Sequence, residues 1–249
     1  MKFIRPMYTS QHSEFILTPL SNILKEGVTA CRAIGDGMES YPVGEYLMQT
    51  LFLKLTGAQE QKMKCICWDL ATLDYEYRYV YLNNKKYGEC STYDVKNKIF
   101  NDLIFIIKKM DPSFEPKSLI DESFLNSFLL NINTMYALSV FPIWQNREYV
   151  FFNSKYNVVF SKKQFLYNDN SKSYLLFQST LSNQYISIVY RHRNRCAHNT
   201  LSYQVNKPDF EVLAGEDYGY HSYFFRFAFL ILIDEIFIKL FDKYLSLVK

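Results

Sequence analysis

The apolar residues of this chain recur at the spacing of an α-helix rather than at that of a β-strand. One clear stripe lies between residues 59 and 82, where apolar side chains follow at steps of three, one, three, three and four: Met63, Ile66, Cys67, Leu70, Leu73 and Tyr77. Such steps place the side chains on one helix face. Eight Gly and seven Pro among 249 residues leave few points at which helices must end. The spacing therefore predicts an all-α fold.

Similar patterns along the rest of the chain predict a series of helices and one short hairpin. The expected helices cover residues 13–33, 43–55, 59–82, 92–110, 121–140, 173–198 and 220–247. Residues 148–161 hold two runs of aromatic and β-branched residues around a polar turn, which indicates a small β-hairpin. No Gly/Ser/Pro-rich linker divides the chain. We therefore expect a single domain over residues 1–249, whose motif-bearing helical core covers about 173–249.

Composition excludes several classes of protein. Hydrophobic residues make up 49% of the chain and aromatic residues 18%, which is too much apolar mass for a disordered protein. The net charge of +3 is too small to indicate nucleic-acid binding without a local basic cluster. The most apolar segment, residues 227–233, is far shorter than the roughly 20 residues that span a bilayer. We therefore expect a folded protein with no membrane partner.

The cysteines and the N-terminal residues bear on the compartment. Five Cys, an odd number scattered along the chain, fit free thiols in a reducing compartment better than a disulfide framework. The first residues lack the continuous apolar stretch of a signal peptide. Together these features favour the cytoplasm.

Residues 190–203, with the sequence YRHRNRCAHNTLSY, concentrate chemistry that the rest of the chain lacks. A purely structural interpretation places the arginines near a helix C-terminus, where cations are favourable, and the histidines on polar surface. On an ideal helix Asn194 and His198 share a face, and Arg191 has nearly the same azimuth. Arg193 lies about 140° from His198. The two can serve one phosphate through the reach of the arginine, through a local distortion, or through two copies of the chain related by a two-fold axis.

The six residues from Arg193 to His198, RNRCAH, resemble the Arg-x4–6-His motif of the HEPN superfamily of all-α ribonucleases, in its common form Arg-Asn-x-x-Ala-His. The resemblance implies a helical bundle of the HEPN type and a metal-independent endoribonuclease. In that reaction the 2′-hydroxyl of the RNA attacks the adjacent phosphorus and leaves a 2′,3′-cyclic phosphate. It further implies that His198 acts as general acid and base, that Arg193 binds the scissile phosphate, and that Asn194 orients the pair. An imidazole and a guanidinium suit these tasks.

The wider site and the partners follow from the same resemblance. We expect Arg191, Arg195, Asn199 and Tyr203 to contact RNA. Arg193 and His198 need no cofactor for this reaction, and four His with no Cys/His cluster at ligand spacing argue against a metal site. The resemblance also implies a homodimer with a composite active site, a role in a toxin–antitoxin or phage-defence system, and an antitoxin or another regulatory partner. The alternative is a catalytically inactive helical module of this type that binds a nucleotide or a protein partner.

Overall fold

The described part of the chain is mostly α-helical in the computed structural model, as the apolar spacing predicts. The structure describes residues 10–31, 34–35, 37, 40–83, 90–168, 174–198 and 215–248. Its α-helices are α1 (Ser13–Leu17), α2 (Ser21–Cys31), α3 (Tyr41–Leu73), α4 (Tyr75–Asn83), α5 (Tyr93–Met110), α6 (Glu122–Ala137), α7 (Phe141–Trp144), α8 (Asn146–Val159), α9 (Ser179–Tyr185), α10 (Arg191–His198) and α12 (Tyr223–Val248). Short 3₁₀ helices cover Pro116–Ser118, Lys162–Gln164 and Glu216–His221. None of the described helices is long and apolar enough to cross a membrane.

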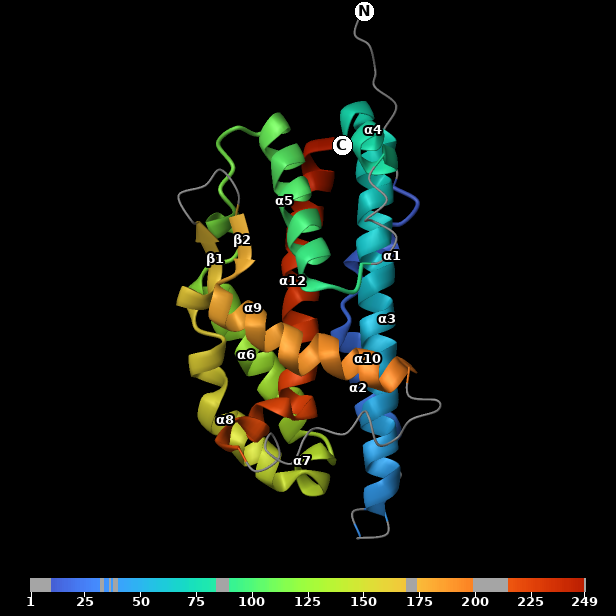
Figure 1. The fold of residues 1–249 in the computed structure, drawn as a ribbon, viewed down its shortest axis with the longest axis vertical. Helices are drawn as coiled ribbons and strands as arrows, with labels where there is room; N and C mark the ends of the chain where they lie inside the picture. Colours follow the sequence, from blue (N-terminus) through green and yellow to red (C-terminus); the bar gives the residue numbers. More distant parts are fainter. Residues whose placement is uncertain are drawn as a thin grey trace, which may run out of the picture.

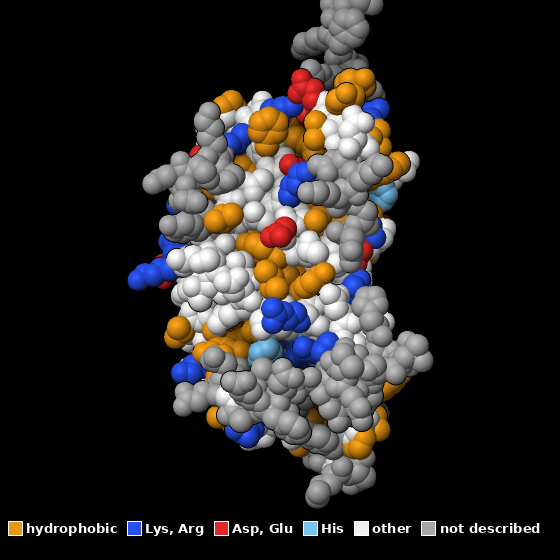
Figure 2. Space-filling model, in the orientation of Figure 1, with side chains coloured by type: hydrophobic (Ala, Val, Ile, Leu, Met, Phe, Trp, Pro, Cys, Tyr) orange, Lys and Arg blue, Asp and Glu red, His pale blue; other side chains and the backbone are white. Residues whose placement is uncertain are grey.

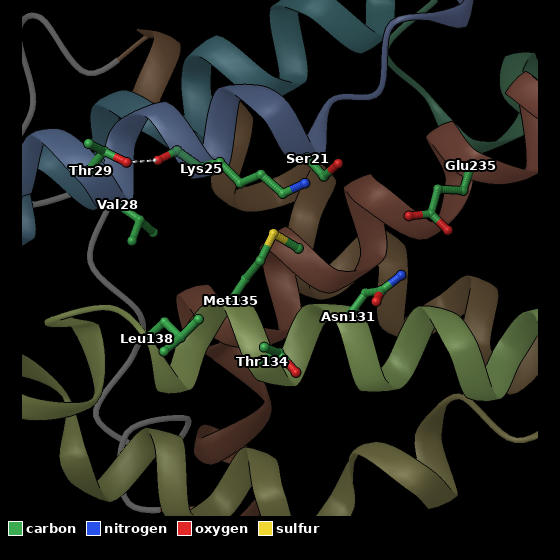
Figure 3. A pocket seen from close by; sticks show the side chains of 9 residues that line it. All are labelled: Ser21, Lys25, Val28, Thr29, Asn131, Thr134, Met135, Leu138 and Glu235. Carbon is green, nitrogen blue, oxygen red and sulfur yellow. Dashed lines mark hydrogen bonds between the residues drawn. The ribbon is translucent and has the colours of Figure 1, made fainter.

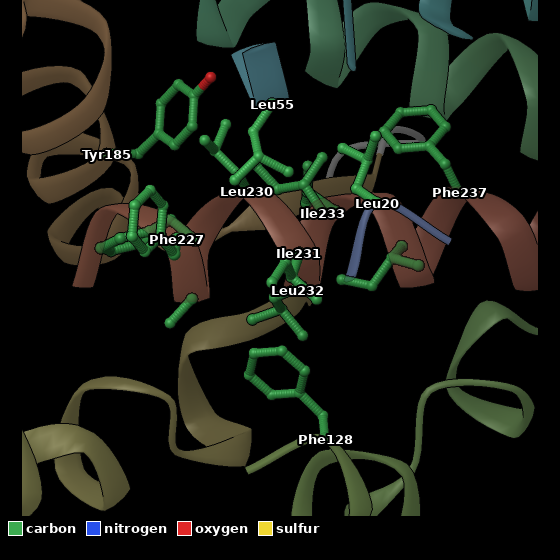
Figure 4. Packing of buried hydrophobic residues seen from close by; sticks show 14 of the residues in the cluster. Leu20, Leu55, Phe128, Tyr185, Phe227, Leu230, Ile231, Leu232, Ile233 and Phe237 are labelled. Carbon is green, nitrogen blue, oxygen red and sulfur yellow. The ribbon is translucent and has the colours of Figure 1, made fainter. Parts of the chain in front are cut away.

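Helix α12 runs through the middle of the molecule, beside α3 and α5 (Figure 1). Its sequence is apolar around most of its circumference, and every residue from Tyr223 to Phe237 except Glu235 is buried. Figure 4 shows side chains from several other helices converging on it, among them Leu55, Phe128 and Tyr185. A helix that is hydrophobic all round needs such complete cover. The abundant Phe and Tyr therefore form the core around α12.

A buried ion pair joins α12 to α3. Lys62 Nζ lies 2.7 Å from Asp234 Oδ1, and both side chains are almost completely inaccessible to solvent. The second carboxylate oxygen of Asp234 accepts a hydrogen bond from the backbone N–H of Leu20 at 2.7 Å, and Lys62 also donates to the carbonyl oxygen of Thr18. Two buried charges are tolerated because each finds several partners. The pair therefore ties the junction between α1 and α2 to the central helices.

Several helix boundaries differ from the sequence prediction. The helix expected over residues 13–33 is broken between α1 and α2, where Pro19 lacks the N–H that a continuous helix needs. The helices expected over 43–55 and 59–82 form one continuous helix, α3, that ends at Leu73. Gly57 does not interrupt it, and a glycine in a helix interior costs only about 1 kcal/mol. The helices expected over 92–110 and 121–140 are present as α5 and α6, with Thr92 and Asp121 as N-caps.

The predicted hairpin at residues 148–161 is wrong. This segment forms α8, in which Phe152 and Tyr156 are four residues apart and stack on each other. Phe152, and Phe160 just after the helix, both contact Phe225 of α12. The hairpin lies further along, where β1 (Phe165–Asn168) pairs antiparallel with β2 (Tyr174–Phe177) and Phe165 lies opposite Phe177. The long helix expected to begin near residue 173 therefore begins only at Ser179.

Candidate functional site

The Arg/His-rich segment lies at the end of a helix that crosses the front of the molecule. This helix consists of α9, a π-helical segment over Ile186–Tyr190, and α10. It crosses α12 and then packs on α3 (Figure 1). Figure 2 shows Lys and Arg side chains, together with a histidine, gathered on the face that it crosses. The crossing brings the motif next to residues from the middle of α3.

A buried arginine braces the π-helical segment. Arg226 of α12 is only 6% exposed, and its Nε donates a hydrogen bond to the carbonyl oxygen of Ile188 at 3.1 Å. Its guanidinium also lies over the ring of Tyr223, 4.9 Å from the centroid. Burial lowers the pKa of Arg226 to about 10, so the group stays charged at neutral pH. A π-turn leaves backbone groups without their usual helical partners, and Arg226 supplies one.

Arg193 is held in place by two side chains. Its Nη1 donates to Asn194 Oδ1 at 3.2 Å, and its Nη2 lies 3.3 Å from Glu60 Oε2 on α3. Glu60 also pairs with Lys64 at 2.9 Å. The Arg193 and Glu60 side chains are 23% and 16% exposed, so the contact is partly shielded from water. A guanidinium has five N–H donors, and these two contacts leave three for another acceptor.

A buried lysine lies close behind Arg193. Lys96 of α5 is 2% exposed, and its Nζ donates to the carbonyl oxygens of Cys90 and Ser91 at 2.7 and 3.0 Å. Burial lowers its pKa to about 8. Lys96, Ser91 and Arg193 line a cavity of only about 10 Å³ together with Gln59, whose Oε1 is buried without a hydrogen bond among the described residues. This cavity has room for one water and not for a nucleotide.

His192, the first histidine of the segment, is partly buried and packs against aromatic core residues. Its ring lies between Phe52 and Tyr223, with centroids 5.0 and 5.5 Å away. Its Nε2 lies 3.3 Å from Tyr223 Oη, and Arg195 Nη2 lies 3.5 Å from its Nδ1. Burial, with the nearby charges of Arg226 and Arg195, lowers the pKa of His192 to about 2. His192 is therefore neutral near pH 7 and does not serve as a proton donor there.

The structure brings some of the predicted site residues together and leaves others undescribed. Arg193 and Asn194 are in contact, Arg191 is exposed, and Arg195 is half-buried beside His192. The backbone of His198 ends α10, while its side chain lies outside the described part of the structure. Asn199 and Tyr203 also lie outside the described residues.

The helix between Arg193 and His198 is regular. Five residues of α-helix place the two positions about 140° apart. The local distortion in this helix, the π segment, precedes Arg193 and leaves this angle unchanged. Of the three explanations for a shared phosphate, the reach of the arginine and a second copy of the chain therefore remain.

Three residues that hold this site were not among those selected from the sequence, although two carry a recognisable signal. Lys96 falls on the same helical face as Ile99 and Leu103, where a charged side chain must find buried partners. Arg226 interrupts a run of phenylalanines for the same reason. Glu60 has no such signal, because its spacing from Lys64 is that of an ordinary surface pair.

Neither metal ligands among the described residues nor similar proteins indicate what this site does. Among the described residues no group of three or more His, Cys, Asp or Glu side chains could hold a metal ion. Comparison with protein-family models, with curated proteins and with solved structures finds no match to this chain. The candidate site therefore depends on the motif and on its surroundings in the fold.

Proposed function

We propose that this protein is a metal-independent endoribonuclease of the HEPN type. In this proposal Arg193 neutralises the scissile phosphate and His198 moves protons, while Asn194 orients Arg193. The exposed Arg191 and the half-buried Arg195, with Asn199 and Tyr203, contact the neighbouring RNA.

The reaction needs only proton transfer and charge neutralisation. The 2′-hydroxyl oxygen bonds to the adjacent phosphorus and loses its proton to a base. The bond from phosphorus to the 5′ oxygen breaks, and that oxygen gains a proton and leaves as a hydroxyl. The products are a 2′,3′-cyclic phosphate and a 5′-hydroxyl end, and no water is consumed. An imidazole can accept the proton of the 2′-hydroxyl and, once protonated, can donate a proton to the 5′ oxygen. A guanidinium can bind the two non-bridging oxygens of the phosphate.

The observation that supports this proposal most strongly is the setting of Arg193. The structure fixes its guanidinium with Glu60 and Asn194 and leaves donors unused. A purely structural surface arginine does not need two anchoring side chains and a buried lysine behind it. Pre-positioned charge of this kind is what phosphate recognition requires.

The same proposal includes a homodimer. Two copies of α10 meeting across a two-fold axis would place both histidines and several arginines in one cleft. Such a pairing overcomes the separation of about 140° between Arg193 and His198 within one helix. It also explains why the cavity of about 10 Å³ beside Arg193 is too small for a nucleotide, since the cleft would form between the copies.

The biological setting follows from the family resemblance alone. We place the protein in the cytoplasm, in a toxin–antitoxin or phage-defence system, where cleavage of RNA stops growth. Uncontrolled cleavage would be harmful, so an antitoxin or another regulatory partner belongs to the proposal.

The test is RNA cleavage by purified protein in EDTA. Wild type, Arg193→Ala and His198→Ala are incubated with total RNA, and new ends are analysed for cyclic phosphate. The matched control is Arg147→Ala, which removes an exposed arginine of α8. We expect wild type and the control to cut RNA and both site variants to lose at least about 100-fold in rate, which is the usual worth of general acid–base catalysis.

Other outcomes of the same experiment contradict the proposal. Equal cutting by wild type and His198→Ala would show a contaminating nuclease. RNA binding by correctly folded wild type without cleavage would favour the inactive nucleotide- or protein-binding module. Cleavage of RNA whose 2′-hydroxyls are methylated would exclude the internal nucleophile.

A further inference from the structure

The groove between α2, α6 and α12 contains a carboxylate without a partner. Glu235 lies where two adjoining hollows of about 400 and 660 Å³ meet, and it lines both of them. It is half-buried and makes no hydrogen bond or ion pair with any described residue. Its neighbour Asp234 points to the other side of α12, toward Lys62. Burial raises the pKa of Glu235 to about 7, because water that would stabilise its charge is excluded.

An ammonium group faces this carboxylate across the groove. In Figure 3, Lys25 of α2 and Glu235 of α12 extend toward each other from opposite sides, with Ser21 between them. Lys25 and Glu235 form no ion pair, and the exposed Lys25 side chain makes no ion pair or hydrogen bond with another described residue. The amide of Asn131 lies just below Glu235. The hollow of about 400 Å³ is therefore lined by one negative and one positive group, with polar side chains beside them.

The wall beside these polar groups is apolar. Val28 of α2, Met135 of α6 and Leu138, which directly follows α6, line the hollow of about 400 Å³ away from Glu235 (Figure 3). A hollow of this size falls in the range of small-molecule sites. The site thus combines one carboxylate, one ammonium and an apolar surface.

We propose that this groove binds a small zwitterion, namely an amino acid with an aliphatic side chain. The ligand's ammonium group meets Glu235, with Ser21 and Asn131 as further acceptors. Its carboxylate meets Lys25, and its side chain packs on Met135 and Val28. Each charged group of the ligand thus gains a partner of opposite sign, and so do Lys25 and Glu235. This inference does not depend on the proposed ribonuclease function.

The second lysine of the region does not compete for the same ligand group. Lys239 of α12 lines only the larger hollow, and its Nζ lies over the ring of Phe124, 5.2 Å from the centroid. A simple polyamine is disfavoured because Lys25 would repel its second charge. A simple fatty acid is disfavoured because Glu235 would repel its carboxylate.

The test is titration of the full chain with L-leucine by calorimetry at pH 8. Two probes each lack one charge: isopentylamine has no carboxylate, and isocaproic acid has no amine. We expect saturable binding of leucine and at least about tenfold weaker binding of both probes, since each loses one charge-assisted contact. Equal binding of isopentylamine and leucine, or no saturable leucine binding up to about 10 mM, would overturn the inference.

Variants assign the contacts. Glu235→Gln and Lys25→Met should each weaken leucine binding about tenfold. The matched control, Asp242→Asn, makes a similar change on an exposed site two helical turns further along the same face of α12, and it should leave the affinity unchanged. Unchanged affinity in Glu235→Gln, with a normal thermal unfolding curve, would also overturn the inference. RNA cleavage by Glu235→Gln stays at the wild-type rate, so this inference and the proposed function fail separately.

Discussion

The face crossed by α10 and the groove beside α12 differ in how sequence and packing contribute to each site. The α10 face is dense in charged residues, and side chains from α3, α5 and α12 pack against them so closely that the described cavity has about 10 Å³. The groove has an ordinary sequence, yet its two hollows have about 400 and 660 Å³. A motif therefore shows where chemistry is concentrated, whereas space for a ligand depends on how helices diverge.

Burial favours the neutral form of one titratable group in each region, which is the deprotonated form of His192 and the protonated form of Glu235. On the α10 face, burial keeps His192 neutral between aromatic rings. In the groove, burial without a partner holds a proton on Glu235 up to about neutral pH. Folded-state stability should therefore respond to pH with opposite sign in the two regions.

The largest expected effect concerns the buried ion pair between Lys62 of α3 and Asp234 of α12. Asp234→Ala leaves Lys62 charged and buried without its partner, so we expect a loss of about 3–5 kcal/mol in the free energy of unfolding. Urea denaturation measures it. Asp242→Ala, on the exposed side of the same helix, should change stability by less than about 0.5 kcal/mol. A loss below about 1 kcal/mol in Asp234→Ala would show that the pair does not hold α12 to α3.

The α10 face should lose stability in acid. The pKa of His192 is about 2 in the folded state against an ordinary value of 6.5, so the unfolded chain binds a proton that the folded chain rejects. This contribution to stability is lost progressively as pH falls below about 6.5. His192→Phe removes the titration, and we expect it to gain about 2 kcal/mol relative to wild type between pH 6.5 and 4.5. Parallel stability curves for the two proteins would contradict the burial of His192.

The groove should show the reverse slope. The pKa of Glu235 is raised from 4.5 to about 7, so the folded chain holds a proton that the unfolded chain releases. This group therefore lowers stability as pH rises from about 4.5 to 7. Glu235→Gln should gain about 1–2 kcal/mol relative to wild type over that interval, with partial exposure reducing the ideal value. The stability difference between Glu235→Gln and wild type should rise with pH, whereas that between His192→Phe and wild type should fall. If both differences change in the same direction with pH, the comparison of the two regions fails.

The smallest expected effect concerns the anchor of Arg193. Glu60→Gln removes a charge but keeps a hydrogen-bond acceptor, so we expect RNA cleavage to fall about threefold, a change of less than 1 kcal/mol. The control Glu26→Gln removes one partner of an exposed pair with Lys54 and should have no effect on cleavage. An unchanged cleavage rate in Glu60→Gln would assign the contact to packing alone.

The sequence predicts most helices because their apolar faces are regular. Thr92 and the stripe from Val95 to Ile107 locate α5, and the apolar run after Tyr223 locates α12. The hairpin was misplaced because aromatic runs around Asn153 satisfy strand and helix patterns equally well. The π segment leaves no trace in periodicity, and Arg226, which binds one of its carbonyl oxygens, lies 38 residues away along the chain.

The residues of the two candidate sites also differ in whether the sequence alone can predict them. Arg193 and Asn194 can be selected from the sequence because their motif is local. Glu60 is 133 residues from Arg193 along the chain, and only tertiary packing brings them together. Glu235 could not be predicted at all, because its lack of a partner depends on the space between α2 and α6.

The most direct test of the central claim is complementation between two inactive variants. Arg193→Ala and His198→Ala are unfolded together, refolded as a mixture and assayed for RNA cleavage in EDTA. If an arginine of one copy and a histidine of the other serve one phosphodiester, half of the dimers are mixed and each has one intact site. The mixture should then recover about a quarter of the wild-type rate. Mixed dimers that form and show no recovery would contradict the account.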